Sequence, residues 1–349
     1  MSADGRRTVV VTGASAGLGY HAAEQLAASG HRVVLATRDR GRAAAAEQSI
    51  RRHVDGASLA HVHLDLADLD SVRAAADELA ALEPDGVDAI VNNAGVVGAS
   101  TPSTTAQGTE LQIGTNHLGH FAWTALTLPL LEQRGGRVVH LGSIAHRWAS
   151  LDTGDPFRVG HYSSYRQYGR SKLAVMLFGF ELAQRLADAG SSVASVVAHP
   201  GLSLDALSPE RPDVAPSRPE PAWTRPAQRL YAQGKDAGAE PLVHAAVAAD
   251  VRSGSTGARP GGCSYADPQP WSVPSRVHTT GPLPRVSGRP ANVVPEPRSL
   301  STHSSDHRLA GGCRTPFVQS TAMTITSDRG TATSGRNAFG EPTDPTSPA

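Results

Sequence analysis

A tyrosine and a lysine four residues apart are the side chains of this sequence best suited to proton transfer. Tyr168 and Lys172 stand at the start of a run, Gly169 to Arg185, whose apolar residues recur at helical spacing. Residues four apart on a helix share one face, so the two polar tips can reach one locus. A phenol has an ordinary pKa of ~10, and a neighbouring ammonium group lowers that pKa by favouring the phenolate. We therefore predict that Tyr168 is a general acid or base and that Lys172 lowers its pKa.

The same spacing is also typical of an ordinary surface pair on a helix. Lysine is otherwise rare, since Lys235 is the only other one in the 349 residues. The catalytic interpretation therefore depends on the segments that precede the pair.

The first thirty residues predict a strand, a glycine-rich turn and a helix. Thr8 to Thr12 is a β-branched run typical of a buried parallel strand, and Tyr20 to Ala28 is an alanine-rich helix. The turn between them can approach a phosphate closely, and the helix N-terminus supplies free N–H groups and a positive dipole. This context favours dinucleotide binding over a simple turn. The residues expected near the cofactor are Gly13, Ser15, Gly17, Leu18 and Gly19.

The second predicted strand, Arg32 to Thr37, ends where such a protein selects its cofactor. An acidic side chain there binds the ribose 2′-hydroxyl of NAD, whereas an arginine suits the 2′-phosphate of NADP. Thr37 is neutral and Arg38 follows it, which favours NADP over NAD. Asp39 leaves NAD open, because it could reach the ribose if Arg38 turned away.

Four more strands are predicted, each preceded by a helical run. They are Ser58 to Leu64, Val87 to Asn92, Gly136 to Gly142 and Ser192 to Ala198, and the helical runs include Gly41 to His53, Leu69 to Leu82 and Glu110 to Leu131. Strands alternating with helices predict a parallel, doubly wound α/β sheet of the Rossmann type in a single domain. Ligands bind at the carboxyl ends of such strands. Further cofactor contacts are therefore expected at Asp65, where helix capping is the alternative, and at Leu66, Asn92, Ala94, Gly95, Pro200 and Gly201.

Composition argues against several classes of partner. The 32 basic and 32 acidic side chains give no reason to expect nucleic acid or an anionic membrane as partner. Cys263 and Cys313 lack metal or redox spacing, and His61 and His63 lack a third ligand, so no metal site is predicted. No uncharged segment approaches the ~18 residues of a membrane span, and there is no apolar leader. A soluble, cytoplasmic protein is expected.

The motifs occur in the order and spacing of the classical short-chain dehydrogenases/reductases, which this chain resembles over residues 6 to 254. They are Thr12-Gly13-x-x-x-Gly17-x-Gly19, Asn92-Asn93-Ala94-Gly95, Asn116, Ser143, Tyr168-x-x-x-Lys172 and Pro200-Gly201. The run Asn116 to Phe121 is similar to the retinol-dehydrogenase-like branch. Gly169 to Leu182, together with His199-Pro200-Gly201, also resembles ketoreductases of the daunorubicin C-13 type.

The resemblance implies reduction of a ketone or aldehyde by NADPH, or the reverse, with an anthracycline-type polyketide as one candidate substrate. It implies that Tyr168 protonates the developing alkoxide and that Lys172 also holds the nicotinamide ribose. It further implies that Ser143 hydrogen-bonds the substrate carbonyl and that Asn116 supports a water-linked proton relay. Family members are often dimeric or tetrameric, so a homo-oligomer is a candidate assembly. A sugar-nucleotide epimerase would share Tyr168 and Lys172 but would have differently spaced glycines.

Two departures and the last part of the chain keep a second hypothesis open. Ser203 stands where the family usually has a threonine, and the proline-rich Ser208 to Pro226 replaces substrate-covering helices with a lid or linker. Residues 255–349 hold 13 of the 25 prolines and only 12 Leu, Ile, Val and Phe residues in 95, below the ~20% that flags disorder. We predict a catalytic domain over 1–254, followed by a tail that is disordered or out of frame and lacks the family's seventh strand. The second hypothesis is a nucleotide-binding regulator or inactive remnant.

Overall fold

A computed structural model describes residues 5–98, 101–151, 162–216, 228, 230, 232–251, 253–254 and 256–257. All of these belong to one compact unit, Met1–Leu283. A second unit, Pro284–Ala349, lies outside the described residues, as do most of the predicted tail and half of the proline-rich segment.

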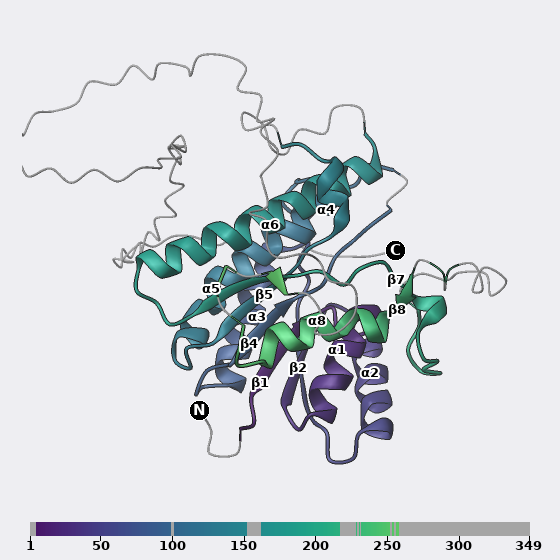
Figure 1. Ribbon diagram of the computed structural model, residues 1–349, viewed down its shortest axis with the longest axis vertical. Helices are drawn as coiled ribbons and strands as arrows, with labels where there is room; N and C mark the ends of the chain where they lie inside the picture. Colours follow the sequence, from purple (N-terminus) through teal and green to yellow (C-terminus); the bar gives the residue numbers. More distant parts are fainter. Residues whose placement is uncertain are drawn as a thin grey trace, which may run out of the picture. The chain divides into compact units, whose positions relative to one another are not determined.

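A parallel sheet forms the centre of the unit (Figure 1). Its order is β3-β2-β1-β4-β5-β6-β9, and every pair of neighbours is parallel. The strands are β1 (Thr8–Thr12), β2 (Arg32–Thr37), β3 (Ser58–His63), β4 (Ala89–Asn92), β5 (Arg137–Leu141), β6 (Ala194–Ala198) and β9 (Thr256–Gly257). The order reverses between β1 and β4, and this switch point is where a doubly wound sheet opens a crevice for a ligand. The predicted fold class is confirmed.

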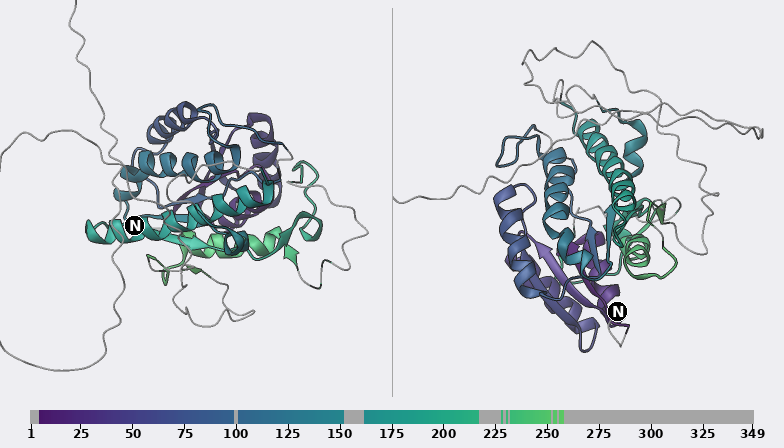
Figure 2. Two further views of the ribbon diagram at one scale, coloured as in Figure 1. Left: turned by 90° about the horizontal axis from the view of Figure 1, so that it is seen from above. Right: turned by 90° about the vertical axis from the view of Figure 1, so that its left-hand side faces the viewer.

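Helices cover both faces of the sheet (Figure 2). The longer ones are α1 (Gly17–Ala28), α2 (Arg40–His53), α3 (Leu69–Leu82), α5 (His120–Glu132), α6 (Ser164–Asp188) and α8 (Lys235–Val247). Shorter elements are α4 (Leu111–Ile113), the π-helix η1 (Gly114–Gly119), the 3₁₀-helices η2 (Ile144–Trp148) and η3 (Asp205–Leu207), and the paired strands β7 (Ser203–Leu204) and β8 (Gln233–Gly234).

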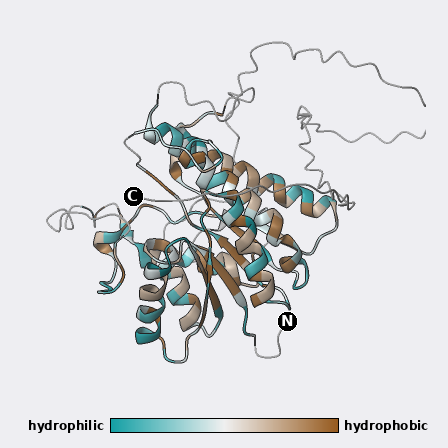
Figure 3. Ribbon diagram, turned by 180° about the vertical axis from the view of Figure 1, so that it is seen from behind, coloured by the Kyte–Doolittle hydropathy of each residue, from teal (hydrophilic) through white to brown (hydrophobic). Residues whose placement is uncertain are grey.

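Alternate residues of the central strands point into two separate cores. Val9 and Val11 of β1 pack with α1, α2 and α8, whereas Val10 packs with α3, α5 and α6. Both faces of β1 are therefore buried, which explains why its sequence is a continuous apolar run rather than an alternating one. Figure 3 shows the same pattern, with hydrophobic strands at the centre and hydrophilic residues on the outer faces of the helices.

The single helix predicted from Glu110 to Leu131 is wrong in detail. The structure divides this stretch into α4, η1 and α5, and Asn116 lies in the π-helix rather than within a regular α-helix. A π-helix is rare, and it appears frequently at functional sites. The apolar spacing carries no sign of this π-helix.

The prediction that no seventh strand follows Gly254 is also wrong. Thr256 and Gly257 pair in parallel with Val197 and Ala198 of β6 and add β9 to the edge of the sheet. Two residues show no periodicity, and β9 exists because β6 offers it an unpaired edge.

Two fully enclosed histidines should make the fold sensitive to acid. Burial lowers the pKa of His120 and of His140 to about 3.

In the unfolded chain the histidine pKa values are ~6.5, so between pH 6.5 and 3 the unfolded chain binds more protons than the folded one. The free energy of unfolding therefore falls as the pH falls through that window. Each histidine contributes up to about 1.4 kcal/mol per pH unit. Urea unfolding between pH 4 and 6.5 measures this slope, and His140→Leu should reduce it. Replacement of the exposed His53 by glutamine is the control, and an unchanged slope in His140→Leu would contradict the assignment.

Candidate active site

Three of the four predicted catalytic side chains meet at the carboxyl end of β5. Ser143 follows β5 and caps η2, where its hydroxyl accepts the N–H of Ala145 at 3.3 Å. Tyr168 lies in the second turn of α6 and is hydrogen-bonded to Ser143. The ammonium nitrogen of Lys172 lies 5.9 Å from the centre of the Tyr168 ring. The helical spacing therefore brings the tyrosine and the lysine to one locus, as expected from the sequence.

The electrostatics of this group differ from the prediction. Burial raises the pKa of Tyr168, the hydrogen bond with Ser143 lowers it, and Tyr165 raises it. Burial also lowers the pKa of Lys172 to about 8, and its ammonium group donates to the carbonyl oxygen of Leu141 at 3.0 Å. The predicted lowering of the Tyr168 pKa by Lys172 is therefore wrong for this structure, and Tyr168 is a protonated phenol at neutral pH.

Asn116, the fourth predicted catalytic residue, joins the loop after β4 to α6. Its side-chain oxygen accepts the N–H of Val96 at 2.7 Å, and its amide nitrogen donates to the Val96 carbonyl at 3.0 Å. The same nitrogen donates to Ser171 at 2.9 Å, and Ser171 donates to the carbonyl of Tyr168 at 2.8 Å. Sequence reasoning missed Ser171, although a serine between Tyr168 and Lys172 on the buried side of a helix was a usable signal.

The glycine-rich turn is locked to the end of β4. Gly13 has φ +67°, and a β-carbon there would lie 2.9 Å from the α-carbon of Ala94. The hydroxyl of Thr12 accepts the N–H groups of Asn93 and Ala94, each at 2.9 Å. Asn93 in turn donates to the carbonyl of Thr12 at 2.8 Å. Asn93 therefore braces the glycine-rich turn, and Gly13 is required by the close approach of the two strand ends.

Two residues of the Asn92–Gly95 motif serve the protein itself in this structure. Asn92 donates to the hydroxyl of Thr124 at 2.9 Å. A β-carbon on Gly95 would lie 3.2 Å from the side-chain oxygen of Asn116. The small size of Gly95 therefore leaves room for Asn116.

The N-terminus of α1 is open, unlike those of the next two helices. Asp39 caps α2 and Asp68 caps α3 through their side chains, whereas Ala16 offers α1 no such cap. The first N–H groups of α1, around Gly17 to Gly19, therefore remain for an external acceptor. Ser15 precedes these groups and Leu18 lies among them, and both side chains are partly buried. A phosphate group fits the donors and the dipole at this turn.

An exposed arginine, Arg38, follows the end of β2. Arg38 is exposed and makes no hydrogen bond or ion pair with any residue that the structure describes. Asp39, the competing residue, accepts the N–H of Arg42 at 3.0 Å as the cap of α2. Its carboxylate is thus engaged, whereas the Arg38 guanidinium remains available for a phosphate.

The remaining predicted cofactor residues follow strand ends, where some of them hold local turns and one packs in the core. Asp65 accepts the N–H of Ala67 at 2.9 Å, so it closes a local turn and does not cap α3. Leu66 is 5% exposed and packs in the core, which leaves only its backbone for a ligand. Gly201 has φ +67°, and the preceding carbonyl of Pro200 accepts from Ser203 at 2.7 Å and Gln233 at 2.8 Å. Sequence reasoning missed Gln233, which has no motif around it.

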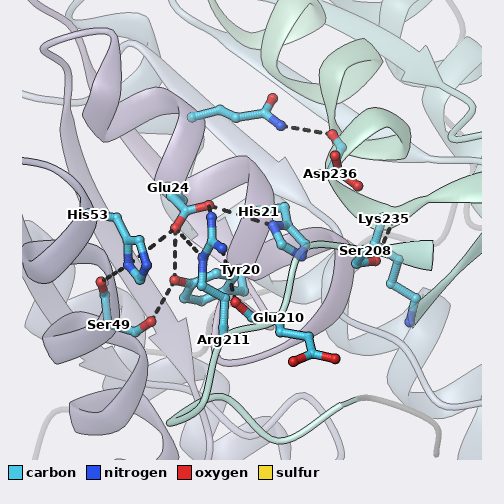
Figure 4. Close-up of polar contacts among 11 residues, drawn as sticks. Tyr20, His21, Glu24, Ser49, His53, Ser208, Glu210, Arg211, Lys235 and Asp236 are labelled. Atoms are coloured by element: carbon cyan, nitrogen blue, oxygen red, sulfur yellow. Dashed lines mark hydrogen bonds and ion pairs between the residues drawn. The ribbon is translucent and has the colours of Figure 1, made fainter. Parts of the chain in front are cut away.

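The segment after β7 is fastened to α1 by a polar cluster (Figure 4). Arg211 donates to both carboxylate oxygens of Glu24 at 2.9 and 3.0 Å, and Tyr20 donates to Glu24 at 3.0 Å. Burial alone would raise the pKa of Glu24, but hydrogen bonds from His21, Arg211 and Tyr20 bring it to about 2. The carboxylate is thus charged at any physiological pH and holds the described first half of the proline-rich segment against α1.

Replacement of Arg211 by leucine should therefore loosen this segment. It leaves the Glu24 carboxylate without its bidentate partner, at a cost of about 1.5–3 kcal/mol for hydrogen bonds to a charged group. Urea unfolding measures the loss, and limited proteolysis should become faster within residues 203–216.

Arg185→Leu is the matched control, because the ion pair of Arg185 with Glu181 is more than half exposed and is worth under about 1 kcal/mol. Equal destabilisation by the two variants would contradict the anchoring role of Arg211.

No helix within the described ranges is long and apolar enough to cross a membrane. In the same part of the chain, no group of three or more histidine, cysteine or acidic side chains is placed to hold a metal ion.

Comparisons with known proteins agree with this geometry. Residues 7–208 match the family described as short chain dehydrogenase. Human retinol dehydrogenase 13 is 38% identical over 203 residues, which cover 58% of this chain and 60% of that protein. Mouse polyprenol dehydrogenase is 43% identical over 203 residues, covering 56% of this chain and 59% of that protein. The chain thus matches about 60% of the length of these relatives.

Solved structures show the same fold. A protein from Mycobacterium paratuberculosis is 37% identical, with a TM-score of 0.56 over 72% of this chain and 79% of that one. A short chain dehydrogenase from Burkholderia cenocepacia, in complex with NADP, is 25% identical with a TM-score of 0.54 over 72% and 95% of the two chains. The chain belongs to the short-chain dehydrogenase family, in its retinol-dehydrogenase-like branch.

Proposed function

We propose that this protein is an NADP-dependent oxidoreductase that reduces a ketone or aldehyde to an alcohol, or catalyses the reverse reaction. The observation that carries the proposal is the group of Ser143, Tyr168 and Lys172 at the carboxyl edge of the sheet. The open N-terminus of α1, which fits the phosphates of a dinucleotide, lies at the same carboxyl edge of the sheet. Bound there, NADPH would supply the hydride.

The chain's own residues would manage the proton and the charge on the substrate oxygen. Tyr168, whose raised pKa keeps it protonated, donates its hydroxyl proton to that oxygen as the hydride adds to carbon. Ser143 offers a second hydroxyl beside it, and two fixed donors stabilise a developing oxyanion. Lys172 brings a positive charge to the same locus. Asn116 holds α6 in position through Ser171.

The choice of NADP rests on Arg38. Its exposed guanidinium suits the 2′-phosphate, whereas the Asp39 carboxylate, which would favour NAD, caps α2 through one of its oxygens. The Burkholderia cenocepacia relative, solved with NADP, supports the same choice.

The substrate we propose is bulky and largely apolar, with an anthracycline-type polyketide ketone as one candidate. Trp148 and Tyr165 are 65% and 58% exposed, and their ring centres lie 6.5 Å apart close to the catalytic group. Ile144, which follows Ser143, and Leu202, which follows Gly201, are also exposed apolar side chains. Retinol dehydrogenase 13 and polyprenol dehydrogenase are named for large apolar alcohols, which supports this class.

We propose residues 1–254 as the NADP-binding and catalytic domain, with the strand pairing of Thr256 and Gly257 extending it slightly. Residues 258–349 lie outside the described residues.

Loss of the Tyr168 hydroxyl tests the activity. NADPH oxidation with a panel of aromatic and polyketide ketones should fall at least about 100-fold in Tyr168→Phe, because general acid catalysis contributes that much. Binding of NADPH, followed by fluorescence, should stay within about threefold, since the aromatic ring is kept.

Tyr165→Phe, which removes a hydroxyl from the same helix, is the control and should retain turnover. Tight NADPH binding without turnover of any carbonyl compound by the unaltered protein would instead indicate a regulatory or inactive nucleotide-binding protein.

Reversal of charge at Arg38 tests the cofactor. Arg38→Asp should raise the KM for NADPH at least about tenfold, because it replaces a charge-assisted phosphate contact by repulsion. The KM for NADH, which has no 2′-phosphate, should change little or fall.

Arg40→Asp makes the same charge change two residues later, at the start of α2. A smaller effect there is expected. Equal effects of the two variants would mean that net charge, and not a contact with Arg38, sets the preference.

A further inference from the structure

One buried imidazole bridges the glycine-rich turn and the catalytic asparagine. His120 is the first residue of α5 and is 3% exposed. One ring nitrogen, Nε2, lies 2.9 Å from the hydroxyl oxygen of Thr12. The other, Nδ1, lies 3.0 Å from the carbonyl oxygen of Asn116. Thr12 and Asn116 are themselves 0% and 1% exposed, so water does not compete for these contacts.

Counting hydrogen-bond donors assigns the protons along this bridge. The Thr12 oxygen already accepts two backbone N–H groups, those of Asn93 and Ala94, and this uses both of its lone pairs. Its own proton must therefore be donated, and Nε2 of His120 at 2.9 Å is a closer acceptor than the carbonyl of Val91 at 3.3 Å. Nε2 is thus the bare nitrogen of a neutral imidazole. Nδ1 then carries the proton and donates it to the Asn116 carbonyl.

The opposite tautomer fails at both ends. A proton on Nε2 would give Thr12 a third donor, and a bare Nδ1 would face the lone pairs of the Asn116 carbonyl. A doubly protonated ring would also overload Thr12. Burial, which lowers the pKa of His120 to about 3, keeps the ring neutral at physiological pH.

The helix is irregular at this bridge. In an α-helix the N–H of residue 120 would bind the carbonyl of residue 116, but here it binds the carbonyl of His117. The His120 ring, and not its backbone N–H, is therefore the group of residue 120 that donates to the Asn116 carbonyl. On its other side, Asn116 reaches α6 through Ser171.

We propose that His120 is a positioning residue that couples the cofactor-binding turn to the catalytic asparagine, by accepting from Thr12 and donating to the carbonyl of Asn116. The proposal rests on the proposed function, since it assigns the role of a residue behind the proposed site. Through His120, a displacement of the turn at Thr12 would displace the catalytic group, and the reverse. His120 itself touches neither substrate nor cofactor. The bridge runs from β1 through α5 and η1 to Tyr168.

A first test reads the tautomer directly and needs no activity. Long-range ¹H–¹⁵N NMR of histidine-labelled protein should show one ring, absent from His120→Leu, with a protonated Nδ1 and a bare Nε2 between pH 5.5 and 8. A ring that titrates in that range, or that carries its proton on Nε2, would overturn the proposal.

A second test separates the two ends of the bridge. Asparagine at position 120 can place its amide nitrogen near the position of Nδ1, and glutamine can place its amide oxygen near that of Nε2. His120→Asn should keep kcat within about threefold and weaken NADPH binding about tenfold, since the acceptor for Thr12 is lost. His120→Gln should do the reverse, with NADPH affinity kept and kcat lowered about tenfold. His120→Leu should lower kcat and also weaken NADPH binding, because leucine replaces neither ring nitrogen.

His140→Leu is the matched control, because His140 is also fully buried but its Nε2 has no hydrogen-bond partner among the described residues. It should leave kcat and the NADPH dissociation constant unchanged in the folded fraction, measured by near-ultraviolet circular dichroism. If His120→Asn and His120→Gln impair both properties equally, the side chain is merely structural and the proposal fails.

If the unaltered protein shows no turnover, that result contradicts the proposed function but not the role of His120. The NMR result and the NADPH affinities of the three variants would still decide on His120.

Discussion

The close approach of the ends of β1 and β4 is the constraint on which the rest of the site depends. These strands are neighbours at the point where the strand order reverses, so the loops that follow them diverge and leave a crevice. The hydroxyl of Thr12 lies between the strand ends and accepts the backbone N–H groups of Asn93 and Ala94. Gly13 is the consequence, because any side chain there would collide with Ala94.

Burial is the second physical theme, because it shifts the pKa values of three titratable side chains behind the crevice. It lowers the pKa of Lys172 to about 8 and that of His120 to about 3, and it raises the pKa of Tyr168. All three shifts favour the neutral form of the group, as desolvation requires. The result is a proton donor at Tyr168 and a neutral hydrogen-bonding bridge at His120, both held by a buried scaffold.

The sequence predicted the alternation of strands and helices well, because β1 to β6 are buried on both faces or follow glycine turns. The meeting of Ser143, Tyr168 and Lys172 was also predictable from the sequence, since strand ends and helical spacing are local properties. The π-helix at Asn116 and the edge strand at Thr256 were not predictable in the same way. The first depends on contacts with Val96 and Ser171, which are distant in sequence, and the second depends on the free edge of β6.

By itself, therefore, the sequence determined the fold class, the family resemblance and the residue types available for chemistry. These follow from periodicity and from motifs a few residues long. Only the tertiary structure decided what each group is paired with: Lys172 with the Leu141 carbonyl, Asp39 with the N-terminus of α2, and His120 with Thr12 and Asn116. Desolvation and hydrogen bonding depend on all neighbours in space, and those neighbours come from segments far apart along the chain.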